Sequence, residues 1–393
     1  MAWQYGYMKI ALLHNRYLQR GGEDVVVDAE RNLLTTRHEV LFYETDSRNL
    51  PKNRLKTAAL TIYNPYEEKA LTGWLREQRP DVLHVHNTFP LLSPQIYWSA
   101  ALAEVPLVQT LHNYRTVCMN GLLFRDGHPC MECVGRSSLP GILHACYRES
   151  RTASAVVAGM IEVHRLEGSY QQVNRYLALT EEARQTFIEG GLPSERITVK
   201  PNFTADHGIG KGDGGYALFV GRISSEKGVE TLLKAWHILR GQFQLKIVGD
   251  GPEMPRLQQQ SINGVEWLGR KSPTEVAHLM RGAAFLILPS ECFEGMPMTV
   301  LEAFSAATPV IASYIGSLKE LVTHEVNGRH FSVGDPVSLS QQVQSLLDQP
   351  SKLQSLRNNA RAEYERNYTP EIGLTNLERI YQETISIHRT RHD

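Results

Sequence analysis

The sequence predicts an α/β fold made of two doubly wound domains that face each other across a cleft. Short apolar runs alternate with amphipathic stretches along the chain, which is the pattern of parallel strands joined by helices. A polar, glycine-rich run at Asp206–Gly215 interrupts this alternation and is typical of a linker or hinge. A length of 393 residues is enough for two such domains, each with its own core.

The apolar runs mark the expected strands in chain order. Helices are expected between them, and the clearest spans Val229–Leu239, where apolar residues recur at three- and four-residue spacing. The expected strands are Lys9–Leu13, Val40–Phe42, Val82–Val85 and Leu107–Leu111 in the first half, then Tyr216–Val220, Leu245–Val248, Val265–Leu268, Phe285–Leu288 and Pro309–Ala312 in the second.

This order predicts two Rossmann-like domains, one over residues 1–205 and one over 206–369. A cysteine-rich insert at 113–147 interrupts the first domain. The tail is expected to be helical from Ser338, and its last part, 370–393, could pack back on the first domain; periodicity leaves this open. In open α/β sheets ligands bind beyond the carboxyl ends of the strands, so the residues directly after strands are the candidates for a site.

Charge and hydropathy argue against a nucleic-acid-binding protein and against a membrane-spanning or secreted one. Lys and Arg number 41 against 42 Asp and Glu, which argues against the basic surface of a nucleic-acid-binding protein. No apolar stretch approaches about 18 residues, and the leader Met1–Tyr7 lacks the basic and apolar regions of a secretion signal. We therefore expect a cytoplasmic protein with no nucleic-acid partner.

Two cationic side chains follow the strand Tyr216–Val220. Arg222 and Lys227 lie five residues apart after Gly221, at the start of a helix, and could bind a diphosphate. Two solvated charges are an equally good interpretation of these residues alone. Gly249 and Gly251, after the next strand, allow a close approach of the backbone to a ligand, although a plain turn explains them as well.

Two carboxylates bracket a predicted helix start after the strand Phe285–Leu288. Gly295 keeps Glu294 in the loop, and Pro297 marks the helix start, so that Glu302 lies inside the helix. Unsatisfied N–H groups at such a start, here those of Met298, Thr299 and Val300, bind anions, whereas carboxylates accept hydrogen bonds from hydroxyls. A nucleotide-sugar carries both anionic phosphates and hydroxyl groups, so this arrangement suits it.

The first half contributes three further candidates. Gly21 and Gly22 follow the first strand and open a helix, where they could admit a ligand or simply form a turn. His112 ends the strand Leu107–Leu111. His84 and His86 point to one face of their strand, but no acidic partner or third histidine follows at ligand spacing, so we interpret them as structural rather than as metal ligands.

Four of the five cysteines fall inside the insert of the first domain. The central Cys-x2-Cys pair could offer two thiolates to one tetrahedral ion, with the outer two cysteines completing the set. Reduced thiols without a ligand are an equally good interpretation. The candidate ligands of this structural zinc are Cys118, Cys130, Cys133 and Cys146.

Taken together, these residues resemble the retaining GT-B glycosyltransferases of family 4, including those that build bacterial surface polysaccharides. Glu294 and Glu302 match the Glu-x7-Glu motif of that family, and Arg222 and Lys227 match its donor-phosphate pair. His112 matches its active-site histidine, and the Gly21-Gly22 loop matches its glycine-rich loop. The chain departs from the family pattern at Asn113, where Asp is frequent, and at Gly316-Ser317, where Gly-Gly is frequent.

The resemblance implies a transfer, with retained anomeric configuration, from a UDP- or GDP-sugar to a hydroxyl of a saccharide or lipid-linked saccharide. Arg222, Lys227 and the helix N–H groups would stabilise the departing diphosphate without a catalytic metal. Glu302 would bind the ribose, Glu294 the transferred sugar, and His112 would contact the sugar near the reacting carbon. The wider donor site would include Gly21, Gly22, Gly221, Gly249, Gly251, Gly295, Met298, Thr299 and Val300.

Alternatives remain at the level of function and of location. A nucleotide-sugar epimerase on the same scaffold, or a non-catalytic nucleotide-sugar-binding protein, would share most of these residues. Basic residues interleave with leucines over 48–62, and Arg148 and Arg151 precede an apolar stretch at Val156–Ile161. These segments form either a solvated surface and a core helix, or a peripheral contact with the inner face of a membrane.

Overall fold

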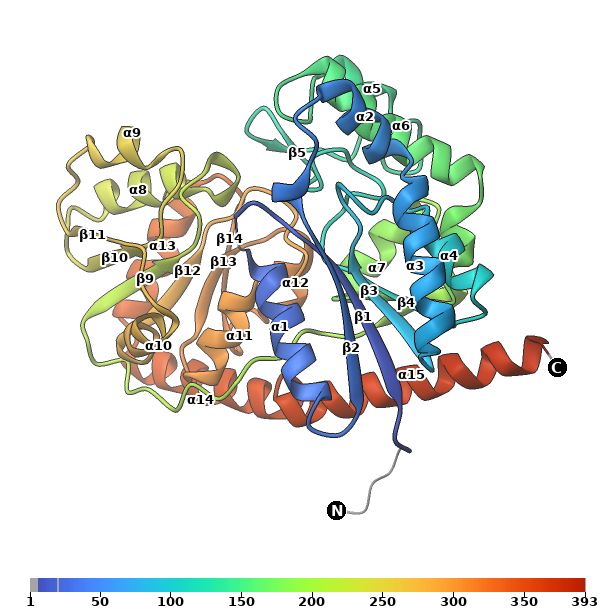
Figure 1. The fold of residues 1–393 in the computed structure, drawn as a ribbon. Helices are drawn as coiled ribbons and strands as arrows, with labels where there is room; N and C mark the ends of the chain where they lie inside the picture. The colour runs from blue at the N-terminus through green and yellow to red at the C-terminus, as the bar shows by residue number, and fades with distance from the viewer. Residues whose placement is uncertain (1–5, 20, 393) are drawn as a thin grey trace. The chain divides into compact units, whose positions relative to one another are not determined.

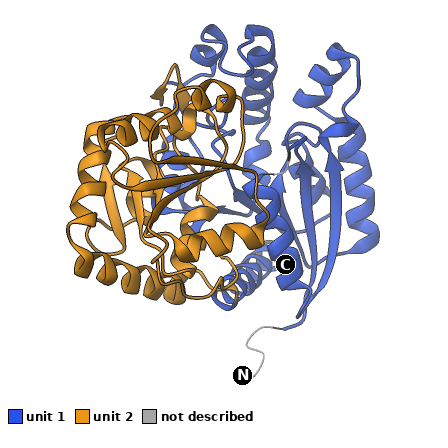
Figure 2. Ribbon diagram, turned by 90° about the vertical axis from the view of Figure 1, so that its left-hand side faces the viewer, with its two compact units in different colours: residues 1–123, 131–201, 371–393 blue, residues 124–130, 202–370 orange. Residues whose placement is uncertain are grey.

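The computed structural model describes residues 6–19 and 21–392, which fall into two compact units (Figure 2). Unit 1 comprises residues 1–123, 131–201 and 371–393, and unit 2 comprises residues 124–130 and 202–370. The division at 201/202 lies four residues before the boundary expected from the sequence. Residues 124–130 of the cysteine-rich insert belong to unit 2 rather than to unit 1. The first five residues of the leader lie outside the described part of the chain.

Unit 1 contains a parallel sheet with the strand order β2-β1-β3-β4-β7-β8 (Figure 1). Its strands are β1 (Lys9–Arg16), β2 (Glu39–Asp46), β3 (Val82–Asn87), β4 (Leu107–Leu111), β7 (Arg175–Ala178) and β8 (Ile197–Val199). Its helices are α1 (Gly22–Leu34), α2 (Arg54–Ile62), α3 (Pro65–Gln78), α4 (Ile96–Leu102), α5 (Leu139–Leu143), α6 (Arg151–Leu166), α7 (Glu181–Glu189) and α15 (Pro370–His392).

Unit 2 contains a second parallel sheet, with the strand order β11-β10-β9-β12-β13-β14. Its strands are β9 (Tyr216–Val220), β10 (Gln244–Val248), β11 (Val265–Gly269), β12 (Phe285–Leu288), β13 (Val310–Ser313) and β14 (Gly328–Phe331). Its helices are α8 (Val229–Ile238), α9 (Met254–Gln258), α10 (Pro273–Gly282), α11 (Met298–Ser305), α12 (Gly316–Leu321), α13 (Pro336–Leu347) and α14 (Pro350–Asn367). A short hairpin, β5 (Phe124–Arg125) and β6 (His128–Pro129), also belongs to this unit.

The prediction of two doubly wound α/β domains is therefore confirmed. All nine expected strands form within a few residues of their predicted bounds. In seven of them the apolar runs are largely buried in a parallel sheet, whereas the apolar residues of the edge strands β2 and β11 are only partly buried. The sequence pattern did not predict β7, β8 and β14, which are only three or four residues long. In β8 and β14 polar residues such as Thr198 and Arg329 interrupt the apolar run, and the apolar run of β7, Tyr176–Leu179, is short.

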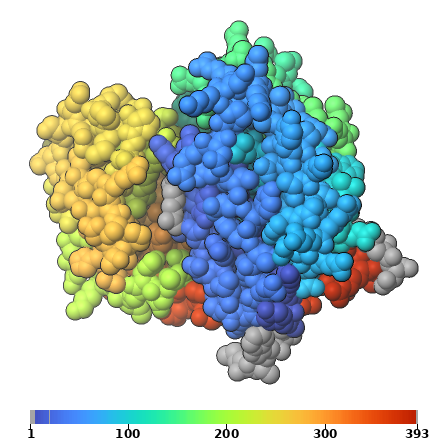
Figure 3. All heavy atoms as spheres, viewed as in Figure 1, coloured from blue at the N-terminus to red at the C-terminus, as the bar shows by residue number. Residues whose placement is uncertain are grey.

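The C-terminal helix α15 completes the core of unit 1. Leu374, Leu377, Ile380, Tyr381 and Ile385 are buried in one cluster with residues of β1 and β4. Two polar contacts add to this packing. Glu378 accepts a hydrogen bond from Arg37 and pairs with His38 at 3.1 Å, and the Tyr381 hydroxyl lies 2.7 Å from Nδ1 of His84. The last turns of α15, red in Figure 3, are mainly exposed.

The segment 206–215 forms no helix or strand, but it is not a free linker. Asp206 pairs with Arg361, and the carbonyl oxygens of His207 and Gly210 accept hydrogen bonds from Arg281 and Arg357. A Cβ atom on Gly210 would overlap the backbone of Arg281. The segment lies within unit 2, and the missing side chain of Gly210 allows its backbone to pack closely against Arg281. Its role as a linker or hinge stays a prediction.

No helix in the described ranges combines the length and the apolar character that a membrane span requires.

The buried face of α15 gives a prediction about stability. The substitution Leu377→Ala should lower the free energy of unfolding by about 2–5 kcal/mol, because it leaves a cavity under a fully buried side chain. Urea titration of the full chain, followed by circular dichroism, measures this loss. Leu166→Ala is the matched control: Leu166 is 87% exposed on α6, and its replacement should change stability by less than about 0.5 kcal/mol. Equal effects of both substitutions would contradict the assignment of α15 to the core.

Candidate active site

The strand order of unit 2 places its candidate residues at a break in the winding of the chain. From β9 the chain proceeds through β10 and β11 to one edge, then returns to β12 beside β9 and proceeds to the other edge. The loops that follow β9 and β12 therefore leave neighbouring strands in opposite directions. This switch point is where open α/β sheets bind their ligands.

Lys227 and Glu294 come from these two loops and meet there. Nζ of Lys227 donates a hydrogen bond to Oε1 of Glu294 at 2.5 Å, and the Ser290 hydroxyl donates to the same oxygen at 2.7 Å. Burial opposes the charge on Lys227, but the carboxylate of Glu294 outweighs this effect, so the pKa of Lys227 lies above its ordinary value. The structure thus brings together one cationic and one acidic residue that the sequence singled out.

Arg222 and Glu302 lie on the same two chain segments. Arg222 follows β9 and is exposed. Glu302 lies inside α11, as predicted, and burial raises the pKa of its carboxyl group above the ordinary value.

The start of α11 differs in one detail from the expectation. The helix begins at Met298 with Pro297 as its N-cap, as predicted. The N–H of Val300, however, donates to the carbonyl oxygen of Pro297 at 3.1 Å, so the expectation that it is unsatisfied was wrong. The first turn tightens and uses this donor itself. Met298 and Thr299 keep the positions expected at the first turn, and Gly295 lies in the loop before it.

The glycines after β10 serve a packing role that the sequence did not reveal. A Cβ atom on Gly249 would overlap the carbonyl oxygen of Gly221, and one on Gly251 would overlap the backbone of Ile223. The two loops are joined by a hydrogen bond from the N–H of Ile223 to the carbonyl oxygen of Asp250 at 2.8 Å. Glycine is required here for the contact between loops, and this contact holds Gly221 and Arg222 in place.

Ser317 stands where the resembled family often has glycine, and it contacts the loop of Glu294. Its hydroxyl donates to the carbonyl oxygen of Glu294 at 2.8 Å. The departure from the family pattern therefore adds a hydrogen bond that positions one of the two carboxylates.

Unit 1 has its own switch point, between β1 and β3. Gly21 caps the helix α1 that follows β1, and Gly22 is its first residue. A Cβ atom on either glycine would meet open space, so packing within the described chain does not require glycine at these positions. The open space is consistent with the approach of a ligand.

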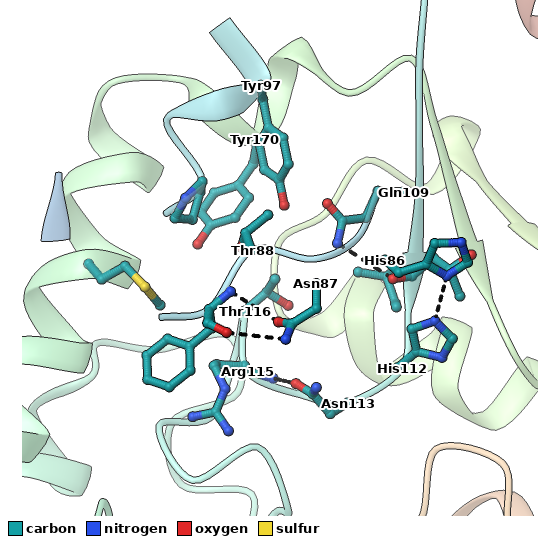
Figure 4. A pocket seen from close by; sticks show the side chains of 15 residues that line it. His86, Asn87, Thr88, Tyr97, Gln109, His112, Asn113, Arg115, Thr116 and Tyr170 are labelled. Atoms are coloured by element: carbon teal, nitrogen blue, oxygen red, sulfur yellow. Dashed lines mark hydrogen bonds between the residues drawn. The ribbon is translucent and has the colours of Figure 1, made fainter. Parts of the chain in front are cut away.

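His112 lines a pocket at the carboxyl ends of β3 and β4 (Figure 4). The pocket also contains several buried polar atoms without a hydrogen-bond partner among the described residues. They are Oε1 of Gln109, Nε of Arg115, Oγ1 of Thr116 and the hydroxyl of Tyr170. Because buried polar groups normally have partners, these atoms indicate a site for a polar ligand or for water.

His84 and His86 do have an acidic neighbour, contrary to the expectation from spacing. It is Glu30 of α1, whose Oε2 lies 3.8 Å from Nδ1 of His84 and 3.6 Å from Nε2 of His86. His112 supplies the third histidine, with Nε2 2.9 Å from Nδ1 of His86. The sequence could not show this, because Glu30 and His112 approach only through the parallel packing of β3, β4 and α1.

This cluster is nevertheless a poor cation site. Nζ of Lys200 donates to Oε1 of Glu30, and both residues are buried. The two ring nitrogens of His84 are already bonded, to Thr110 at 2.8 Å and to Tyr381 at 2.7 Å. A divalent ion would add charge beside a buried ammonium group with only one carboxylate to balance both. The structural role assigned to His84 fits these contacts.

Glu23 is a site residue that the sequence analysis missed. It lies in the first turn of α1, and its Oε2 accepts a hydrogen bond of 3.4 Å from Asn113, next to His112. Burial and the charge of Asp24 raise the pKa of Glu23 to about 8, although Arg115 and Asn113 oppose the shift. The sequence signal that could have identified Glu23 is its position as an acidic residue directly after Gly21-Gly22.

The cysteines of the insert do not form a compact ligand set in unit 1. Among the described residues, Glu30, His84 and His86 form the group of potential metal ligands whose atoms all lie within 4.8 Å, and Cys118, Cys133 and Cys146 form no such group. The thiol of Cys118 contacts Oδ1 of Asn120 at 3.0 Å. Cys130 belongs to unit 2. The structural zinc site therefore stays a prediction.

The two segments considered for membrane contact differ in burial. In the stretch Val156–Ile161, Val157, Ala158, Met160 and Ile161 are buried in a core cluster, which fits the interpretation of a core helix. On α2, by contrast, Arg54, Leu55 and Lys56 are exposed. A peripheral membrane contact through α2 stays a prediction.

Two family models match consecutive parts of the chain. The model described as "Glycosyl transferase 4-like domain" matches residues 16–202, and the model described as "Glycosyl transferases group 1" matches residues 202–363. The meeting point of the two matches, at residue 202, agrees with the division between the two units.

Proteins that are similar in sequence to this chain include named glycosyltransferases. An uncharacterized glycosyltransferase of Methanocaldococcus jannaschii is 31% identical over 200 residues, which are 50% of this chain and 56% of that protein. A phosphatidyl-myo-inositol mannosyltransferase of Mycobacterium leprae is 26% identical over 81% of this chain and 78% of its own length. The crystal structure of Anabaena HepE in complex with UDP shares the fold, with a TM-score of 0.71 at 18% identity over 95% of this chain and 100% of that one. The matched models together span residues 16–363, and the chain belongs to the GT-B glycosyltransferases of the group 1, 4-like kind.

Proposed function

We propose that this chain transfers a sugar from a nucleoside diphosphate sugar to an acceptor hydroxyl with retention of configuration. The observation that carries the proposal is the meeting of Lys227 and Glu294 at the switch point of unit 2, with the exposed Arg222 in the same segment after β9 as Lys227. Two family models for glycosyltransferases that together span most of the chain support the reaction class.

The residues of unit 2 divide the work on the donor by charge. As the bond to the sugar breaks, negative charge grows on the leaving diphosphate. Arg222, Lys227 and the first N–H groups of α11 would stabilise this charge, and they would do so without a catalytic metal. Glu294, whose oxygen already accepts two hydrogen bonds, suits the hydroxyls of the transferred sugar, and the buried carboxyl of Glu302 suits those of the ribose.

The pocket of unit 1 would hold the acceptor. Three of its atoms that lack a hydrogen-bond partner among the described residues can bind hydroxyl groups. They are the hydroxyl oxygens of Thr116 and Tyr170 and the amide oxygen of Gln109. Such a lining fits a saccharide or the saccharide part of a lipid-linked acceptor, in the assembly of a cell-surface polysaccharide or glycolipid. His112 at the edge of the pocket would contact the sugar near the reacting carbon.

The nucleotide is the first thing to test. A nucleoside diphosphate sugar present at about 100 times its Kd should add about 2.7 kcal/mol to the free energy of unfolding and so raise the Tm. We expect this with UDP- or GDP-linked sugars, and UDP is the first choice because HepE was crystallised with it. A thermal-shift screen of both series measures the effect. Incubation with the stabilising sugar nucleotide alone then distinguishes transfer from epimerisation, because only an epimerase would convert it to its epimer.

The substitution Lys227→Met should lower kcat about 10²–10³-fold, because it removes one charged donor from the leaving group. Glu294→Gln should also lower transfer strongly. Initial rates with the sugar nucleotide identified by thermal shift measure both effects. Lys234→Met is the matched control, since Lys234 is exposed on α8 and pairs with Glu230 one turn away. Near-normal turnover by the Lys227 variant would exclude the proposed donor site.

Glu23 predicts how stability depends on pH. Its pKa rises from an ordinary value of 4.5 to about 8 on folding, so between these values the folded chain holds a proton there that the unfolded chain has released. Stability should therefore fall as the pH rises through this window, and Glu23→Gln should remove that part of the fall.

Urea midpoints at pH 5, 6, 7 and 8 measure the dependence on Glu23. The advantage of the variant over the original chain should grow across the series. Glu195→Gln, at an exposed position, controls for the general effect of removing a carboxylate. Parallel pH curves for the original chain and the Glu23 variant would show that Glu23 is ionised throughout.

A further inference from the structure

A buried chain of polar side chains lies directly behind His112. Nε2 of His112 is 2.9 Å from Nδ1 of His86, and the two rings are nearly parallel, with centroids 5.3 Å apart (Figure 4). On its other side, Nε2 of His86 lies 3.6 Å from Oε2 of Glu30. Lys200 donates to the second oxygen of Glu30. His86, Glu30 and Lys200 are each at most 3% exposed.

The contact between the two histidines admits two arrangements of protons. In the first, Nε2–H of His112 donates to Nδ1 of His86, and His86 carries its own proton on Nε2, toward Glu30. In the second, Nδ1–H of His86 donates to Nε2 of His112, and Nε2 of His86 turns a lone pair toward Glu30. Both rings are neutral in either case, because burial lowers the pKa of His86 well below its ordinary value and that of His112 to about 3.

The charge of Glu30 distinguishes these arrangements. Burial alone would raise the pKa of Glu30, but the ammonium group of Lys200 holds it below its ordinary value, so the group is a carboxylate. A carboxylate oxygen 3.6 Å from Nε2 attracts an N–H and repels a lone pair, and the buried surroundings screen this effect little. The separation is too short to hold a water molecule between the two atoms.

The other polar neighbours do not compete for these atoms. His84 uses both ring nitrogens on Thr110 and Tyr381. His14 bonds Asp24 through Nε2 at 2.9 Å. Nε2 of His86 and Oε2 of Glu30 have no other hydrogen-bond partner in the described chain, so each is the natural partner of the other.

We propose that His86, oriented by the Glu30–Lys200 pair, is a positioning residue that fixes one tautomer of His112, with the proton on Nε2 and the lone pair on Nδ1. The remaining lone pair of His112, on Nδ1, is then a hydrogen-bond acceptor. An acceptor nitrogen binds the O–H of a sugar or acceptor alcohol and repels anionic oxygens, so this tautomer selects a hydroxyl at that point. The consequence for catalysis rests on the proposed function, whereas the tautomer itself does not.

The test reads the protons of His112 directly and needs no substrate. The full chain is labelled with ¹⁵N-histidine, and long-range ¹H–¹⁵N correlation spectra identify which ring nitrogens carry protons. The signals of His112 are assigned by their loss in His112→Gln. We expect a protonated Nε2 and an unprotonated Nδ1 at neutral pH. A protonated Nδ1 in the original chain would overturn the proposal.

Three variants test the cause. His86→Leu removes the contact and should give His112 a mixture of tautomers, whereas His86→Asn, whose amide oxygen can replace Nδ1 as an acceptor, should restore a single one. Glu30→Gln combined with Lys200→Met removes the charge without leaving an unpaired ion, and it should weaken the preference. His84→Gln is the control in the same cluster and should leave the His112 signals within the original tautomer.

Folding is checked independently, by circular dichroism and Tm, so that loss of structure is not mistaken for loss of the tautomer. In a folded His86→Leu variant, an unchanged single tautomer of His112 would show that His86 does not position it, and would overturn the proposal. If instead the tautomer behaves as expected but no sugar nucleotide binds the chain, the proposed function fails while the positioning by His86 stands.

Discussion

The reversal of winding between β9 and β12 is the constraint on which the rest of unit 2 depends. Two neighbouring strands release their chains in opposite directions, so their loops meet at this point. One backbone hydrogen bond, from the N–H of Glu291 to the carbonyl oxygen of Glu226 at 2.9 Å, joins the two loops. Side chains add further bridges: Lys227 donates to Glu294, Thr231 donates to Glu291 at 2.6 Å, and Ser317 of α12 donates to the carbonyl oxygen of Glu294. These bridges hold the proposed donor residues in place before any ligand arrives.

Unit 1 contains a buried ion pair close to its own candidate pocket. Glu30 and Lys200 lie beneath the ends of β3 and β4, where isolated charges would be costly, and they are stable there as a pair. The pair influences the histidines around it without touching the pocket that His112 lines. A layer of neutral imidazole rings thus separates the buried ion pair from the pocket. These rings carry no net charge, but the direction of one hydrogen bond to a ring can set the direction of the next.

The sequence was sufficient for the fold class and for most elements, because burial on both faces of a parallel strand leaves a plain apolar run. It failed for β7, β8 and β14, because the apolar run of β7 is short and those of β8 and β14 are interrupted by polar residues. In the site it identified His112, which follows β4 directly, and Lys227 and Glu294, which lie in the segments after β9 and β12.

The spacing of residues in the sequence could not reveal contacts between distant segments of the chain. Glu23 is adjacent to a recognised motif, but its contact with Asn113 depends on the packing of α1 beside β4. Glu30 and Lys200 are 170 residues apart in the chain. For the same reason the close approaches of Gly210 and of the glycines after β10 to neighbouring backbones were not predicted.

The placement of α15 has a consequence for how the chain matures on the ribosome. The residues of unit 1 that precede unit 2 share their core with Leu374, Leu377 and Tyr381, which are synthesised only after unit 2. Residues up to 370 complete unit 2, so it can fold while unit 1 still exposes the apolar surface around Met8, Ile10 and Leu12. The segment of unit 1 that is synthesised before unit 2 therefore has its core completed after it.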